Sequence, residues 1–378
     1  MSNPSSTRPF DRSAEQPAAT QLSRIDQLLP VWIFMAMGIG IAIGKMFPDF
    51  GDTLDRVKIV GVSLPIAIGL LWMMYPVLAK VRYEALGRFS TQYKLFGTSL
   101  LFNWLIGPFL MFGLAWLFLP DEPAYRTGVI LIGLARCIAM VLIWNMLAHC
   151  DGEVAAVLVA LNSVFQIAMY SVLGWLFLTE IPSWFGVEQT GVHISMWDIA
   201  KNVLIFLGIP LAAGFLTRTI LVKCRGAEWY DTRFIPRIGP TALLGLLYTI
   251  VLMFAMQGEK ILDSPIDVLR IALPLVTYFA IMFTLAFVSS WKLGFSYQDS
   301  AAIAFTATGN NFELAIAVAI GTFGIASQEA LAGVVGPLIE VPSLIALVYL
   351  SLWLRDRLFP NAVQLPVGTM PTPRRQTL

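Results

Sequence analysis

Long apolar blocks separated by short polar connections run along most of the chain. A block of about 20 residues with almost no charge can cross roughly 30 Å of hydrocarbon as a helix, because each helical residue rises about 1.5 Å. The pattern therefore predicts an all-α polytopic membrane protein with ten transmembrane helices. The predicted spans are residues 28–47, 60–79, 95–119, 127–148, 154–178, 198–217, 237–257, 269–290, 299–320 and 329–354.

Internal repetition indicates how these spans are organised. A shift of 176 residues lays EVAAVLVALNSVFQ over EALAGVVGPLIEVP, Gly133 over Gly309, and Cys137 over Glu313. Ordinary close packing of glycine-containing helices is the alternative explanation for the glycine matches. Because five is an odd number of spans, two tandem copies must have opposite orientations, and we expect two inverted five-helix repeats.

The domain division follows from the repeats. We expect the first five-helix repeat over residues 28–178 and the second, inverted repeat over 179–354. Residues 1–27 are polar, rich in Ser, Pro and Ala, and without an apolar stretch. They predict a disordered cytoplasmic tail and not a cleaved signal peptide. Residues 355–378 predict a second cytoplasmic tail for the same reason.

Composition and charge add the orientation. The chain is 57% hydrophobic and only 13% charged, as expected for a membrane protein. With both termini in the cytoplasm, 17 of the 25 Lys and Arg residues lie on that side, seven lie outside, and Arg136 lies within the membrane. This excess predicts a multi-pass protein of the cell membrane, plasma or bacterial inner, with both termini cytoplasmic. A vacuolar membrane is the alternative.

Spans four and nine contain glycine and polar residues in their middle, in the strings GLARCIAM and FTATGNNFELAIA. These residues weaken a helix, and backbone freed at membrane depth is tolerated only inside protein or beside a water-filled cavity. Broken helices at corresponding positions of two inverted halves mark a binding site near the midplane. We therefore expect both spans to be broken and to form the site.

Three ionisable residues are placed deep in the membrane, namely Arg136, Glu313 and Glu340. A central charge costs about 2.5–3.5 kcal/mol on insertion scales, so such groups usually mark a transport pathway. For Arg136 the alternative is a structural Arg–Glu pair. A carboxyl group removed from water favours its neutral form, which suits Glu313 as a reversible proton carrier. Glu340, between two prolines in GPLIEVP, is the second candidate, or else stabilises a broken span ten.

Cys137 is the candidate ligand for a soft metal or metalloid. Free cysteine is often only a small buried hydrophobe. Here an adjacent guanidinium and a broken-helix end would both favour the thiolate, which binds soft metalloids. The two side chains point about 100° apart on an ideal helix, so they share one cavity only if the chain unwinds. Cys150 and Cys224 lie too far along the chain to form a multi-thiol trap, and a single thiol suits a carrier that must release its cargo.

Amide side chains supply further polar groups to the predicted site. Asn310 and Asn311 lie in the break of span nine. Asn162 and Gln166, one helical turn apart in span five, are expected to satisfy the exposed backbone of span four.

The strings GLARCIAMVLIWN, LVALNSVFQ and TGNNFELAIAVAIGTFGI resemble the arsenical-resistance permeases of the bile acid/arsenite/riboflavin transporter superfamily. The resemblance runs from about Leu28 to Trp353. It implies ten spans in two inverted repeats, with a core domain that moves against a panel domain and with broken helices crossing in the core. It also implies that Cys137 and Glu313, the cysteine of GLARC and the glutamate of NNFE, are essential to transport.

The activity implied is secondary antiport that expels arsenite, As(III), as its uncharged trihydroxide, and in many members antimonite, in exchange for protons. Cys137 would be the As(III) ligand, Asn310 and Asn311 would bind the remaining hydroxyls, and Glu313 would carry the proton. The chain reads WNMLAHCDGE where the family pattern continues WNDLAKGD, and Thr308-Gly309 stands where alanine-serine is usual. These departures bear on antimonite preference.

Other functions are weighed against this one. A sodium-coupled organic anion symporter of the bile acid type, with the same fold, would have no use for the thiol of Cys137. An enzyme would need a catalytic set, but the two histidines, His149 and His193, lie near loops and no HExxH motif is present. We expect no cofactor and no nucleic-acid partner, and the sequence leaves the oligomeric state open.

Overall fold

The computed structural model describes residues 28–360 except for 48, 55, 60, 82, 84–91, 187–194 and 325–326. The described chain is helical apart from connecting loops and one short antiparallel hairpin, which confirms the all-α prediction. The predicted tail 1–27 lies outside the described residues. The last helix continues through Leu358, into the first residues of the predicted tail 355–378.

The element bounds are as follows, with η marking a π-helical turn. The first half contains α2 (Leu29–Met46), α3 (Phe50–Leu54), β1 (Lys58–Ile59), β2 (Val62–Ser63), α4 (Leu64–Ala79), α5 (Tyr93–Leu101), η2 (Phe102–Ile106), α6 (Gly107–Phe118), α7 (Pro123–Leu134), α8 (Met140–Leu147), α9 (Gly152–Trp175), η3 (Leu176–Glu180) and α10 (Ile181–Trp184). The second half contains α11 (Met196–Val203), η4 (Leu204–Gly208), α12 (Ile209–Arg225), α13 (Ala227–Trp229), η5 (Tyr230–Phe234), α14 (Ile235–Asp263), α15 (Pro265–Lys292), α16 (Tyr297–Thr308), α17 (Phe312–Phe323) and α18 (Gln328–Leu358).

Each predicted span coincides with one continuous or interrupted helical run. In the described part of the chain, six runs are long and apolar enough to cross a membrane, and shorter apolar helices accompany them. The six are Tyr93–Phe118, Gly152–Trp184, Met196–Arg225, Ala227–Met256, Pro265–Lys292 and Gln328–Leu358. Large apolar side chains such as Leu117 (70% exposed) and Ile209 (56%) cover their outer faces, as expected for contact with lipid.

Two details of the predicted spans are wrong. Span two was expected to begin at residue 60, but Val62–Ser63 is the strand β2, which pairs with β1, and the helix begins at Leu64, followed by Pro65 in its first turn. Span ten was offered as a broken helix, whereas α18 runs without interruption through Pro337 and Pro342. A proline removes one helical hydrogen bond, but the rest of a long packed helix tolerates this loss.

The π-helical turns share a sequence feature. Each of η2, η3, η4 and η5 is followed after one residue by a proline, namely Pro108, Pro182, Pro210 and Pro236. A proline ring pushes against the carbonyl group four residues earlier and offers no N–H to it. A turn widened by one residue relieves this clash and keeps the helix continuous.

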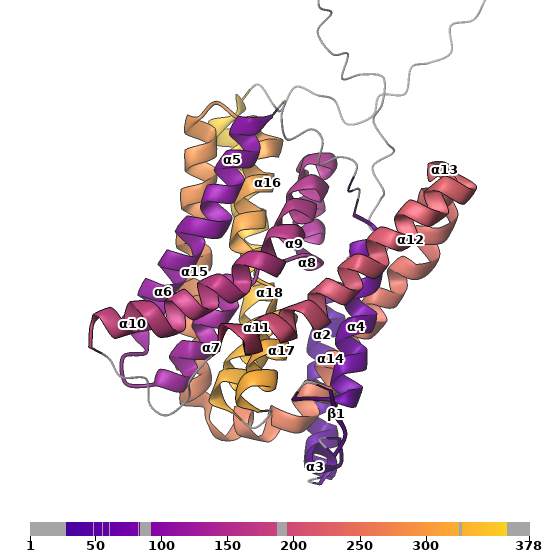
Figure 1. The fold of residues 1–378 in the computed structure, drawn as a ribbon. Coiled ribbons are helices and arrows are strands. Elements are labelled where there is room, and N and C mark those ends of the chain that lie inside the picture. Colours follow the sequence, from indigo (N-terminus) through magenta and orange to yellow (C-terminus); the bar gives the residue numbers. More distant parts are fainter. Residues whose placement is uncertain are drawn as a thin grey trace, which may run out of the picture.

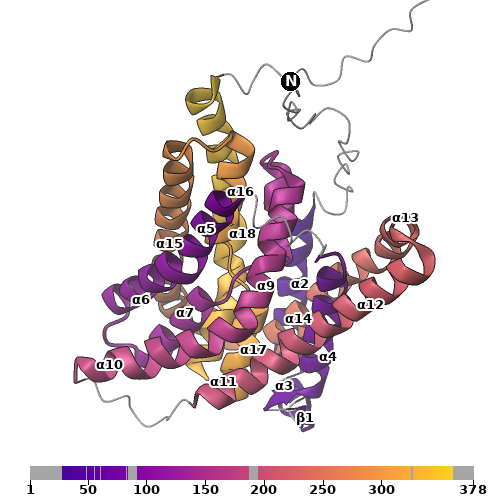
Figure 2. The ribbon, with the colours of Figure 1, turned by 45° about the horizontal axis from the view of Figure 1, so that its top comes forward.

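The helices form two packed groups, shown in Figures 1 and 2. In the first, called here the four-helix group, α14 packs on α2 and α4, and α12 packs on α4. The second, called here the broken-helix group, contains α5–α10 and α15–α18. The continuous run α11–η4–α12 belongs to both, because α11 packs against α9 and α17 while α12 packs against α4. Spans one, two and seven and the second half of span six thus form one group, and spans three, four, five, eight, nine and ten form the other.

Glycines allow the helices of the four-helix group to approach until their backbones are in contact. A Cβ atom built on Gly245 of α14 would lie 2.9 Å from the backbone nitrogen of Met73 in α4. One built on Gly214 of α12 would lie 2.8 Å from the backbone nitrogen of Ala79. Small residues allow membrane helices to approach this closely and gain van der Waals contact.

Candidate transport site at the helix crossing

The two interrupted helices meet inside the broken-helix group. Helix α7 ends before Ala135, which has an extended backbone (φ −85°, ψ 117°), and the chain resumes a helix only at α8. Helix α16 ends before Gly309, also extended (φ −68°, ψ 141°), and the helix resumes at α17. The interruptions predicted in spans four and nine are therefore present.

The two breaks complete each other's backbone hydrogen bonds. Arg136 and Asn310 form an antiparallel bridge. The N–H of Cys137 donates to the carbonyl of Gly309 at 3.1 Å, and the N–H of Asn311 donates to the carbonyl of Ala135 at 3.0 Å. Backbone groups freed by unwinding thus find partners without water, the condition for non-helical chain at membrane depth.

The two asparagines of the NNFE string hold the crossing together. The Nδ2 of Asn310 donates to the carbonyls of Ile132 (2.8 Å) and Ala135 (3.2 Å), at the end of α7. The Oδ1 of Asn311 accepts from the N–H of Leu314 at 3.0 Å and caps α17. The Oδ1 of Asn310 and the Nδ2 of Asn311 are buried and without a partner among the described residues. Each side chain therefore keeps one group available for a polar guest.

The prediction for span five is half right. The Oε1 of Gln166 accepts a hydrogen bond from the backbone N–H of Arg136, so Gln166 does satisfy freed backbone of span four. Asn162 does not. Its Oδ1 accepts from Trp104 Nε1 at 3.1 Å and its Nδ2 donates to Asn103 Oδ1 at 3.2 Å. One helical turn along α9 moves a side chain by roughly 5.4 Å, which places Asn162 opposite η2 instead of the break.

Arg136 is completely buried, and its guanidinium is not paired with a carboxylate. The Nη1 donates to the hydroxyl of Tyr278 in α15 at 2.8 Å and to the carbonyl of Ala307 at 3.1 Å. Its Nε and Nη2 have no partner, and none of the ion pairs in the described part of the chain includes it. The described residues therefore contain no structural Arg–Glu pair that includes Arg136.

The thiol of Cys137 has other neighbours than the guanidinium of Arg136, which contacts Tyr278 and the carbonyl of Ala307. The thiol is 3% exposed, and the backbone N–H groups of Met140 and Val141, at the start of α8, approach its sulfur. Its acidic neighbours are Glu340 and Glu313. The predicted ligand therefore sits at the N-terminus of α8, with backbone N–H groups directed at its sulfur.

Both glycines predicted to support the site lie in tight contact with neighbouring atoms. A Cβ atom at Gly309 would lie 3.0 Å from the Cβ of Cys137 and 3.4 Å from the carbonyl of Phe305. A Cβ atom at Gly133 would collide with the side chain of Met111 in α6. Gly309 thus lets the break of span nine lie directly against the cysteine, and Gly133 lets α7 lie against α6.

The two carboxyl groups occupy different places. Glu340 is fully buried in α18, with Oε1 accepting from the N–H of Asn310 at 3.2 Å and Oε2 unpaired. Glu313 is half-buried in the first turn of α17. It faces a crevice too narrow for a water molecule, lined also by Leu70 and Met74 of α4 and by Phe206 and Leu207 of η4. Glu313 therefore lies at the boundary between the two helix groups, whereas Glu340 lies inside one of them.

A wider cavity of about 760 Å³ opens between α9 and the run η4–α12. Its lining is almost wholly apolar, with the phenol of Tyr83 as the aromatic exception that carries a hydroxyl. The cavity and the crevice at Glu313 are lined by different residues of η4, Leu204 and Gly208 for the cavity and Phe206 and Leu207 for the crevice.

Two residues of the crossing were not predicted. One is Tyr278, whose hydroxyl accepts a hydrogen bond from the guanidinium of Arg136. The other is Gly107, where a Cβ atom would lie 3.0 Å from the Nη1 of Arg136. The sequence carries weak signals for both, a tyrosine in the middle of the apolar span eight and a glycine directly after a π turn. Neither residue can be assigned to the crossing until the packing of α6 and α15 around the break is known.

Sequence comparisons find one matching family and several similar proteins. The Sodium Bile acid symporter family matches residues 67–264. The chain is 52% identical over 352 residues to the arsenical-resistance protein Acr3 of Corynebacterium glutamicum, covering 93% of this chain and 95% of that protein. It is 33% identical over 339 residues to Acr3 of Alkaliphilus metalliredigens (86% and 92% covered). An uncharacterized transporter of Synechocystis is 36% identical over 351 residues (88% and 89% covered).

The names of the matching family and of the cyanobacterial relative are those of transporters, and the apolar helices make this a multi-pass membrane protein. The prediction of a carrier in place of an enzyme is confirmed. The chain therefore belongs to the Sodium Bile acid symporter family and, within it, to the arsenical-resistance proteins that its motifs resemble.

Proposed function

We propose that this protein is a secondary carrier that expels arsenite, As(III), from the cytoplasm in exchange for protons. The observation that carries the proposal is the buried thiol of Cys137 at the crossing of two broken helices, in a chain 52% identical to a named arsenical-resistance protein. A thiol is the protein ligand that suits a soft metalloid. Antimonite, which has the same ligand chemistry, is proposed as a second cargo.

The proposed topology is ten spans in two inverted repeats, residues 28–178 and 179–354, with both termini cytoplasmic in the cell membrane. The order of elements supports it. In each half the first two spans join the four-helix group, and the fourth span is the broken one. The broken-helix group would be the core domain and the four-helix group the panel.

Binding of the cargo is a reversible ligand exchange at sulfur. As(OH)₃ reacts with the thiol of Cys137 so that an S–As bond forms and one As–O bond breaks. The thiol proton leaves with the displaced hydroxyl as water. The free Oδ1 of Asn310 and Nδ2 of Asn311 are proposed partners of the two remaining hydroxyls. Attack of water on arsenic reverses the step and releases As(OH)₃, which a single thiol permits.

Proton coupling is assigned to Glu313 because of its place at the boundary of the two groups. Gain or loss of a proton there changes the charge of the surface that must separate or close, and so changes which state is favoured. Glu340 is the second candidate. Its bond to the N–H of Asn310 makes it better suited to hold the crossing in shape.

The test is As(III) uptake into everted, energised vesicles, with and without an uncoupler. Uptake should collapse with the uncoupler and be absent in Cys137→Ser and Glu313→Gln. Cys150→Ser, which removes a thiol outside the crossing, is the matched control and should transport normally. Wild-type vesicles that take up no As(III), but move an organic anion with sodium, would instead identify a symporter of the bile acid type.

A further inference from the structure

The C-terminal ends of helices α7 and α16 accept hydrogen bonds from different kinds of side chain. The last carbonyl groups of a helix lack intrahelical partners and carry a partial negative charge of about half an electron. At the end of α7 those carbonyls accept from the neutral amide of Asn310. At the end of α16 the carbonyl of Ala307 accepts from the charged guanidinium of Arg136. Asn310 and Arg136 are bridge partners, so the two facing residues of the crossing bring an amide to one helix end and a cation to the other.

Neighbouring residues form a defined site around the guanidinium of Arg136. Its Nη1 contacts the Tyr278 hydroxyl, which itself donates to the carbonyl of Ala307 at 3.1 Å. A Cβ atom on Gly107 would lie 3.0 Å from Nη1 and 3.2 Å from that hydroxyl, so glycine makes the room that the group occupies. No carboxylate in the described part of the chain pairs with Arg136. The charge therefore faces a helix end and a phenol oxygen instead of an acid.

Unwound carbonyls and the C-terminal ends of half-helices are the groups with which transporters coordinate sodium. A guanidinium keeps its positive charge inside proteins. We propose that Arg136 is a tethered cation, which supplies at the end of α16 the charge that a bound coupling cation would otherwise supply. The carrier then works without sodium although its family is named for sodium symporters. This inference rests on the proposed function, because it explains how that carrier runs on protons alone.

The experiment restores the missing charge from solution. As(III) uptake by energised vesicles is measured in sodium-free choline medium for the wild type and Arg136→Ala, with added guanidinium, sodium or urea at millimolar concentration. Wild-type uptake should be the same in choline and sodium media. Arg136→Ala should lose about tenfold or more, and guanidinium or sodium should recover part of the loss. Urea has the shape of guanidinium without its charge and should recover nothing.

Arg126→Ala is the control arginine. Its guanidinium lies over Trp116 and donates to the carbonyls of Leu119 and Pro120 at the edge of the molecule, so added cations should not change its uptake. Recovery of Arg136→Ala by urea as well as by guanidinium, or by none of the three solutes, overturns the proposal.

A second measurement does not depend on transport. Thermal unfolding of purified Arg136→Lys and Arg136→Met compares two unbranched side chains with and without charge. The lysine variant should unfold near the wild-type temperature and the methionine variant well below it. Equal losses would show that shape and not charge is required at this position. Should the wild type carry no As(III), the proposed function fails, whereas the unfolding comparison still decides the role of Arg136.

Discussion

Gly309 is the residue at which the crossing has least space. A Cβ atom there would press on the Cβ of Cys137 at 3.0 Å and on the carbonyl of Phe305 at 3.4 Å. Because the backbone of the break cannot move without losing its bridge to span four, we expect Gly309→Ala to displace the thiol. As(III) uptake should fall by about tenfold or more while the protein still reaches the membrane. Uptake in vesicles, normalised to the amount of protein, measures this.

The control for that substitution is Gly113→Ala in α6, where no atom lies within 4 Å of the added methyl group. It changes the same atoms in an apolar helix and should leave uptake unchanged. Normal uptake by Gly309→Ala would mean that the thiol does not need its present position.

Gln166 forms a hydrogen bond with the backbone of the break in span four. Its Oε1 accepts the N–H of Arg136, and Gln166→Leu would leave that buried N–H without a partner. An orphaned buried donor costs about 1–3 kcal/mol, so the free energy of unfolding should fall by about that amount. Gln166→Glu keeps the acceptor and should lose less. Chemical denaturation in detergent compares the two, and equal losses would contradict the assigned role.

Single residues could be assigned from sequence where the chemistry is rare. Arg136, Cys137 and Glu340 stand out because charge and thiol are uncommon in apolar segments, and the structure places all three at the crossing. Asn162 was assigned wrongly, because its partners Trp104 and Asn103 come from a π turn whose position the sequence did not reveal.

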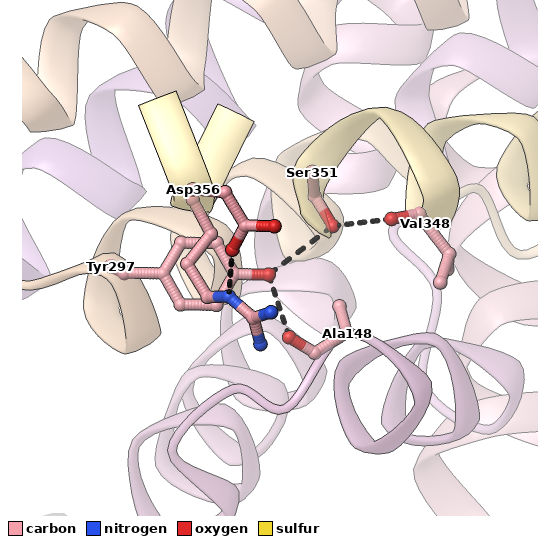
Figure 3. A network of polar contacts seen from close by, with 6 residues as sticks. Ala148, Tyr297, Val348, Ser351 and Asp356 are labelled. Carbon is pink, nitrogen blue, oxygen red and sulfur yellow. Dashed lines mark hydrogen bonds and ion pairs between the residues drawn. The ribbon is translucent and has the colours of Figure 1, made fainter. Parts of the chain in front are cut away.

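At the scale of whole elements, one polar contact set joins three helix ends, as Figure 3 shows. The Tyr297 hydroxyl, at the start of α16, lies 2.7 Å from the carbonyl of Ala148, to which it donates, after the end of α8. It also lies 3.4 Å from the Ser351 hydroxyl in α18, which donates to the carbonyl of Val348 at 2.8 Å. Both broken spans are thereby fixed to the same long helix at one end of the broken-helix group.

Tyr297→Phe should loosen this junction. It removes the donor to the carbonyl of Ala148 and leaves the ring packing intact, so we expect a loss of roughly 1 kcal/mol in the free energy of unfolding. Tyr349→Phe, at an exposed tyrosine of α18, is the matched control and should be neutral. An unfolding midpoint of Tyr297→Phe equal to that of the control would show that the contact contributes nothing.

Element positions were largely predictable, whereas their irregularities were not. The length of each hydrophobic stretch locates a helical run, because only a long apolar helix can cross the lipid. Each π turn precedes a proline, yet Pro240, Pro274 and Pro337 lie inside helices without such a turn before them. Whether a helix widens or simply loses one hydrogen bond depends on its neighbours, and local sequence does not contain that information.

For the whole molecule, the proposed mechanism requires the two helix groups to separate at Glu313. A reversible cross-link between Met74→Cys in α4 and Leu314→Cys in α17, which line the same crevice, should abolish As(III) uptake until a reductant is added. Cys150→Ser and Cys224→Ser remove the competing thiols.

The control cross-link joins Trp72→Cys and Tyr248→Cys, whose rings lie 6.4 Å apart within the four-helix group. Because both belong to one moving unit, uptake should survive this link. Full activity of the cross-linked Met74–Leu314 pair would contradict relative movement of the groups.

The crossing also sets an order of events during synthesis. The unwound segment after α7 leaves the ribosome 175 residues before Asn310. The side chain and backbone of Asn310 supply the hydrogen bonds that this segment needs. At roughly 5–20 residues per second this delay is about 9–35 s. The first half therefore enters the bilayer with an unfinished fourth segment, and the crossing can close only when nearly the whole chain has been made.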